Sequence, residues 1–93
     1  MQFNDTIAMM QSEDYKERFK AEYYQTKIRY ERLKAFNTKI EAAYCTEAHC
    51  PEWKRVEMPK HDCPTPLLSE QQEVMGHYLR ILEVRAVIEG IDL

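Results

Sequence analysis

Four side chains with the chemistry of zinc ligands lie near the middle of the chain. They follow the pattern C-x4-C-x10-H-x-C and are Cys45, Cys50, His61 and Cys63. Thiolate and imidazole are the ligands that tetrahedral zinc prefers, and a zinc ion can hold an irregular loop in place. The first spacing is at the wide end of the usual range, and H-x-C is tighter than usual. Structural zinc is therefore one prediction, and simple packing around a proline-rich turn is the alternative.

Tyrosines alternate with lysines and arginines along the first half of the chain. Aromatic rings beside cations can stack a base and grip a phosphate, so a nucleotide held between subunits is one prediction. The side chains that would hold it are Tyr15, Arg18, Arg29, Tyr78 and Arg85. Alternatively, Tyr23 and Tyr30 pack in a helical interface with their hydroxyls at its edge. For Arg85, the alternative is a structural ion pair with Glu89, four residues further on.

No catalytic residues are predicted. A cysteine paired with His49 or His61 has the residue types of a nucleophile and its base. A helical hairpin, however, offers no evident oxyanion hole or substrate cleft. We therefore expect a protein that is not an enzyme.

A stretch of helix-forming residues from 12 to 44 must position most of these side chains. It contains no Pro or Gly and is rich in Lys, Arg, Glu and Ala. Steps of four and three separate the residues of one line, as in a coiled-coil seam. This predicted seam consists of Phe19, Tyr23, Thr26, Tyr30, Leu33, Asn37, Ile40 and Tyr44. A second line lies nearly opposite and consists of Ala21, Tyr24, Ile28 and Ala35. One partner helix cannot cover both lines.

The remaining elements complete a helical hairpin. The helix is interrupted after residue 45 by Pro51, Pro59, Pro64 and Pro66, and Thr65-Pro66 restarts it. Gly90 followed by Ile91 is typical of a left-handed helix end. We predict one all-α domain over residues 1–93, an antiparallel hairpin of helices 12–44 and 66–89. A connector with Pro and Cys joins them, and a short helical piece over residues 3–10 precedes them. Apolar residues cover about half of the second helix, which predicts a homo-oligomer.

The composition excludes several classes of function. The chain has 93 residues, with 13 basic and 16 acidic side chains and a net charge of −3, so nucleic-acid binding is disfavoured. No apolar run approaches the ~20 residues that cross a bilayer, and residues 1–10 lack the features of a signal peptide. Three cysteines, an odd number, argue against a disulfide framework. We expect a cytoplasmic protein without a membrane partner.

One tryptophan, Trp53, lies among charged residues in the connector. It either caps the end of the hairpin or anchors an interface with another protein. If it is an anchor, the second apolar line of the long helix extends the same surface. The predicted partner-binding residues are then Tyr24, Ile28, Ala35 and Trp53.

Three segments carry a resemblance to a known family. They are DYKERF with AEYYQTKIRYERL near the start, Cys63-Pro64 followed by two leucines, and MGHYLRILEVRAVIEGIDL at the end. The chain resembles a large family of short phage and prophage proteins of unknown function, sometimes labelled after a crAss-like phage gene. Its connector is longer than that family's pattern. The resemblance implies a small accessory protein of a virus that infects bacteria.

Two functions follow from this context and from the residues. The first is a phage-encoded binding protein that inhibits a host defence protein, such as a CRISPR nuclease or another effector, by direct contact. The second is an oligomeric sponge that sequesters a cyclic or modified nucleotide serving as an immune signal. The link from phage accessory proteins to host defence is an analogy and not chemistry found in the residues.

Overall fold

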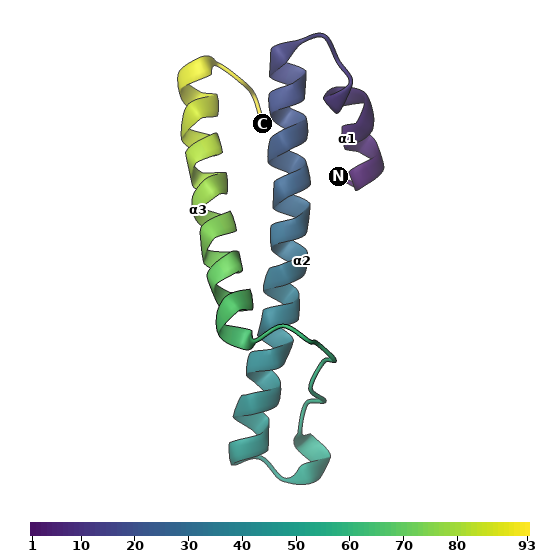
Figure 1. The fold of residues 1–93 in the computed structure, drawn as a ribbon, viewed down its shortest axis with the longest axis vertical. Coiled ribbons are helices and arrows are strands. Elements are labelled where there is room, and N and C mark those ends of the chain that lie inside the picture. The colour runs from purple at the N-terminus through teal and green to yellow at the C-terminus, as the bar shows by residue number, and fades with distance from the viewer.

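The long helix predicted from the sequence is the axis of the molecule. The computed structural model describes residues 1–93, and its elements are α1 (Phe3–Met10), α2 (Tyr15–His49), a single 3₁₀ turn (Glu52–Lys54) and α3 (Thr65–Glu89). α3 runs antiparallel to α2 along one side, and α1 lies against the first half of α2 on the other side (Figure 1). The predicted all-α hairpin with a short N-terminal helix is confirmed.

Local sequence sets where α2 begins and ends. The carboxylate of Asp14 accepts a hydrogen bond of 3.0 Å from the Lys16 backbone N–H, so α2 begins at Tyr15 and α1 is a separate helix. The helix continues past the predicted end at residue 44 to His49, because no proline interrupts it before Pro51. Cys45 and His49 therefore belong to α2 and not to the connector.

The core lies between the first half of α2 and the second half of α3. It consists of Phe19, Tyr23, Leu79, Leu82, Ala86 and Ile91. The predicted seam faces α3: Phe19, Tyr23 and Ile40 are buried, and Thr26 and Leu33 are half-buried. Only Tyr44, near the C-terminal end of α2, is exposed. The seam prediction thus holds for the part of α2 that α3 covers.

The second apolar line of α2 is partly covered by α1. Ala21 is 1% exposed and Thr6 of α1 is fully buried against this side. The Thr6 hydroxyl donates to the Phe3 carbonyl and accepts from the Gln25 side-chain amide at 3.0 Å, so the buried polar group is satisfied. A helix of the same chain therefore covers part of the line for which the sequence predicted contact with another protein.

The C-terminal end of α3 is closed as the sequence predicted. Gly90 has φ 69°, and the backbone N–H of Ile91 donates to the Ala86 carbonyl at 2.8 Å. This left-handed turn brings the apolar side chain of Ile91 back into the core, where it is 6% exposed. No helix in the structure has both the length and the apolar character required to span a membrane.

Candidate functional site

Three of the five residues predicted to hold a nucleotide come together beside the core. Arg85 donates to the Tyr15 hydroxyl at 2.8 Å, and its guanidinium lies 5.1 Å from the centre of the Phe19 ring. Tyr78 lies on the same side of the hairpin, about two helical turns before Arg85 on α3, and donates to Glu22 of α2. α2 and α3 thus place Tyr15, Tyr78 and Arg85 in one cluster.

Carboxylates already neutralise this cluster. Arg85 forms an ion pair of 3.1 Å with Glu89, as the structural alternative predicted. Glu89 also accepts from the Tyr15 hydroxyl at 2.7 Å, and this bond lowers the pKa of the carboxyl and raises the pKa of Tyr15. The hydrogen bond to Glu22 likewise raises the pKa of Tyr78. With two glutamates against one arginine, this cluster does not favour an anionic ligand.

The other two predicted ligand residues lie elsewhere. The Arg18 guanidinium donates to the Ser12 carbonyl at 2.9 Å and so braces the turn between α1 and α2. The Arg29 guanidinium lies 5.5 Å from the centre of the Phe3 ring on the α1 side. The five residues therefore do not form one site within the chain.

The four predicted zinc ligands are spread over α2 and the connector. Cys45 is exposed on α2, Cys50 ends that helix, and the three cysteines are free. His61 directs its Nδ1 atom to the Cys63 carbonyl at 2.8 Å and packs edge-on against Phe36. No three His, Cys, Asp or Glu side chains are grouped closely enough to hold a metal ion.

The four predicted partner-binding residues do not form one surface. Tyr24 and Ile28 are half-buried beside α1, and Ala35 is exposed below it. Trp53 lies in the 3₁₀ turn at the far end of the hairpin and is 78% exposed (Figure 1). Two separate features result: a site next to α1 and an exposed tryptophan at the opposite end.

The site next to α1 is a hollow of about 400 Å³, a volume in the range of small-molecule sites. Its lining residues come from the N-terminus of the chain and from one face of α2, and they are Met1, Gln2, Tyr24, Lys27, Ile28, Glu31 and Arg32. The Tyr24 ring packs edge-on against Tyr23 at 5.2 Å between ring centres, so the core holds its orientation. The hollow therefore has an apolar, aromatic wall made by Tyr24 and Ile28.

Two cations border this wall without a carboxylate partner. Lys27 lies 5.8 Å from the centre of the Tyr23 ring, and Arg32 lies 4.7 Å from the centre of the Phe3 ring. Neither belongs to an ion pair; the two in the chain are Lys20–Glu17 and Arg85–Glu89. Contact with the aromatic rings fixes the positions of the Lys27 ammonium and the Arg32 guanidinium. Their N–H groups stay free to bind an anion. The hollow carries two cations against one carboxylate, Glu31.

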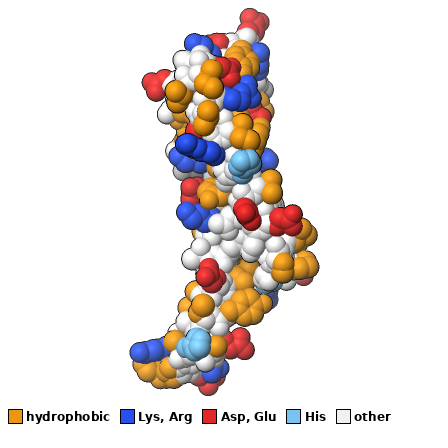
Figure 2. Space-filling view, turned by 90° about the vertical axis from the view of Figure 1, so that its left-hand side faces the viewer, with side chains coloured by type: hydrophobic (Ala, Val, Ile, Leu, Met, Phe, Trp, Pro, Cys, Tyr) orange, Lys and Arg blue, Asp and Glu red, His pale blue; other side chains and the backbone are white.

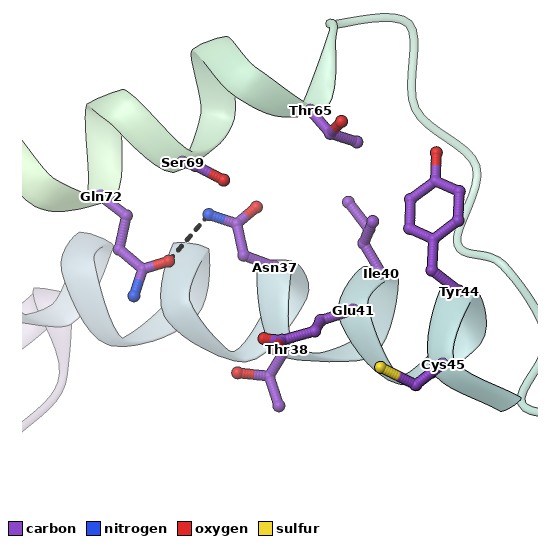
Figure 3. Close-up of a pocket in the computed structure, with 9 residues that line it drawn as sticks. All are labelled: Asn37, Thr38, Ile40, Glu41, Tyr44, Cys45, Thr65, Ser69 and Gln72. Carbon is purple, nitrogen blue, oxygen red and sulfur yellow. Dashed lines mark hydrogen bonds between the residues drawn. The ribbon is translucent and has the colours of Figure 1, made fainter.

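A second hollow, between α2 and the start of α3, has a different chemistry. Figure 3 shows Asn37 and Gln72 facing each other across it, joined by a hydrogen bond of 2.9 Å. Its volume is about 320 Å³, and its lining combines amides and hydroxyls with the side chains of Ile40 and Cys45; Glu41 is the only charged residue of this lining. It offers no cation to an anionic ligand, so the hollow beside α1 is the better candidate.

Comparison with known proteins identifies the family. A family model described as Sequestin matches residues 13–88. The chain belongs to the Sequestin family. No curated protein and no solved structure matches it. The family assignment is compatible with the predicted short phage protein, whereas the crAss-like label remains a prediction.

The Sequestin match covers α2 and nearly all of α3, and it includes the face of α2 that lines the hollow. The sequence predicted Tyr24 and Ile28 as binding residues but did not single out Lys27 and Arg32. Steps of three and four relate Tyr24, Lys27, Ile28, Glu31 and Arg32, so they share one face of a helix. That spacing could have shown that the five residues lie together. It could not have shown that α1 packs beside them.

Proposed function

We propose that this member of the Sequestin family binds and sequesters a cyclic or otherwise modified nucleotide in the hollow that Met1 and Gln2 form with α2, next to α1. The observation that carries the proposal is the pair of free cations, Lys27 and Arg32, beside the ring of Tyr24. Such a ligand combines an apolar, stackable base with phosphate charge. The hollow offers a matching surface for both parts.

The geometry assigns a role to each residue. Tyr24 and Ile28 would contact the base, because they form the apolar wall. Lys27 and Arg32 would contact phosphate oxygens, and their five-residue separation corresponds to about 7.5 Å along the helix axis. A ligand with two phosphates can therefore reach both cations. Arg32 suits a phosphate especially well, because its planar guanidinium can donate two parallel hydrogen bonds.

The family name supports binding without turnover. Sequestration requires a protein that holds its ligand, and the name indicates a binding protein more than an enzyme. A sponge for a signal need only lower the free concentration of that signal. Free cations on a rigid helix meet this need, because they are positioned before the ligand arrives.

A second candidate function is inhibition of a host defence protein by direct contact. It is favoured by Trp53, which is 78% exposed and has the Lys54 ammonium 4.9 Å from its ring centre. An exposed tryptophan of this kind resembles the anchor of a protein interface. Because Tyr24 and Ile28 lie at the other end of the molecule, such an interface would use the connector alone.

Calorimetric titration of the purified chain with cyclic dinucleotides, cyclic trinucleotides and ADP-ribose derivatives tests the main proposal. We expect saturable binding of at least one ligand. Lys27→Gln and Arg32→Gln should each weaken it about tenfold or more, which corresponds to one lost charge-assisted hydrogen bond. Lys34→Gln is the matched control, since it removes a cation from α2 outside the hollow and should leave binding unchanged.

Two outcomes would contradict the proposal. A panel with no binding would remove the nucleotide as ligand. Loss of binding in Arg85→Gln with unchanged binding in Lys27→Gln and Arg32→Gln would place the site at the Tyr15 cluster. If the panel shows no binding while Trp53→Ala abolishes capture of a host defence effector, the second function holds.

A further inference from the structure

The outer face of α3 carries an apolar stripe that nothing in the chain covers. Its residues are Leu67, Val74, Ile81, Val84 and Ile88, with exposed fractions of 55%, 60%, 43%, 43% and 77%. Figure 2 views the molecule from this side and shows hydrophobic side chains running down it among charged ones. The exposed side chains of Glu70 and His77 lie on the same face between these residues, so the stripe is a row of spaced apolar side chains. Exposed apolar side chains gathered on one face of a helix mark an interaction surface.

The spacing of the stripe fits another helix. Leu67, Val74, Ile81 and Ile88 recur every seven residues, and Val84 lies three residues after Ile81 and four before Ile88. A seven-residue apolar repeat is the pattern of a coiled-coil seam, in which a second helix supercoils along the first. The stripe runs from Leu67 to Ile88 within the 25-residue α3 and so extends for about 32 Å.

When two copies of α3 pair antiparallel, charges beside the stripe of one copy meet opposite charges of the other. Glu73 and Arg80 are exposed on the same flank, and neither forms an ion pair within the chain. An antiparallel pair sets Glu73 of each helix opposite Arg80 of the other, which gives two attractive contacts. A parallel pair would set Arg80 of each helix near Arg85 of the other, which gives two repulsive contacts.

We infer that α3 is a homodimer interface, in which two copies of this chain pack antiparallel along the stripe. In this register Leu67 packs near Val84 of the second copy, and Val74 and Ile81 lie near the centre. The interface goes beyond the proposed nucleotide site and does not depend on it. α1 lies against the other side of α2 (Figure 1), so both hollows of the dimer would stay open to ligand.

Light scattering during size-exclusion chromatography over a concentration series tests the interface. The wild-type chain should approach twice its mass of 11.1 kDa as concentration rises. Ile81→Asp should give 11.1 kDa at concentrations where the wild-type chain is dimeric. Ala8→Asp is the control for the added charge: Ala8 is exposed on α1, which lies on the other side of α2 from α3 (Figure 1), so this variant should stay dimeric. Circular dichroism checks that both variants remain helical.

A charge exchange tests the orientation. Glu73→Arg and Arg80→Glu should each weaken dimerisation about tenfold at low salt, because each change turns two attractive contacts into repulsive ones. The double variant, which carries both Glu73→Arg and Arg80→Glu, should recover wild-type dimerisation. Unchanged or tighter dimerisation by Arg80→Glu alone would overturn the antiparallel arrangement. A wild-type chain that is monomeric throughout, or an Ile81→Asp variant that still dimerises, would overturn the interface itself.

Discussion

The hydroxyl of Tyr23 on α2 donates a hydrogen bond of 2.7 Å to the carboxylate of Glu83 on α3, and the tyrosine is 5% exposed. Two further tyrosine–glutamate bonds join the same helices, Tyr15 to Glu89 and Tyr78 to Glu22. Burial and the neighbouring carboxylate raise the pKa of Tyr23 to about 12. The hairpin is thus held at its edges by neutral phenols that donate to carboxylates.

Alkaline pH should loosen this hairpin in a specific window. The unfolded chain loses the Tyr23 proton near pH 10, whereas the folded chain keeps it until about pH 12. A raised folded pKa contributes stability that is fully present below pH 10 and is lost as the pH rises toward 12. We expect the free energy of unfolding to fall by about 2 kcal/mol in this window from Tyr23 alone. Urea unfolding at a series of pH values measures how steeply the free energy of unfolding falls with pH.

The control for this prediction is a pair of phenylalanine variants. Tyr23→Phe should reduce the alkaline slope and cost about 1 kcal/mol at neutral pH through the lost bond to Glu83. Tyr44→Phe should change neither quantity, since Tyr44 is 53% exposed. A Tyr23→Phe variant with the wild-type slope would show that other groups carry the alkaline sensitivity.

Leu82 should be the most sensitive aliphatic position of the core. Its side chain is 0% exposed and packs in the cluster formed by α2, α3 and Ile91. Leu82→Ala should lower the free energy of unfolding by about 2 to 5 kcal/mol, since it leaves a cavity in a small core. Val87→Ala on the same helix should cost less than about 0.5 kcal/mol, because Val87 is 84% exposed. Equal effects of the two changes would contradict the packing described for α3.

Gly90 should resist substitution for a backbone reason. Its φ of 69° lies in the left-handed region, and no atom lies within 4 Å of where a Cβ would stand. Gly90→Ala should therefore cost about 1 kcal/mol from backbone strain without any steric clash. Gly90→Asn should cost less, because asparagine tolerates this conformation better. Thermal unfolding measures both. If alanine is neutral, the end of α3 unwinds without loss and Ile91 contributes little to the core.

Much of this fold could be predicted from the sequence because the helix signals are local. The seam from Phe19 to Ile40, the restart at Pro66 and the end at Gly90 all depend on residues a few positions apart. The start of α2 was misplaced by three residues, since Ser12 and Asp14 are both good caps and only the three-dimensional turn selects between them. A helix boundary is hard to predict from sequence where two neighbouring residues can cap the helix about equally well.

The candidate site was less predictable because it depends on the path of α1. Tyr24 and Ile28 were recognised as an apolar line, but the sequence could not show that α1 folds back onto them. Arg85 and Tyr15 were predicted to hold a nucleotide between subunits; within the chain they contact each other at 2.8 Å. The ion pair of Arg85 with Glu89 was predicted as the alternative, whereas the approach of Glu22 from the opposite helix was not.

The ring of Tyr24 should matter more to ligand binding than its hydroxyl. The structure orients this ring edge-on against Tyr23, at the wall of the hollow that Lys27 and Arg32 border. If a base stacks there, Tyr24→Phe should bind the nucleotide within about twofold of wild type. Tyr24→Leu should lose roughly 1 to 3 kcal/mol of binding free energy, which is the usual contribution of one stacked base. Calorimetric titration with the ligand found in the panel measures both, and circular dichroism shows whether α2 stays helical. Binding that falls equally in the two variants would assign the contact to the hydroxyl, and the ligand would then meet Tyr24 through a hydrogen bond and not through stacking.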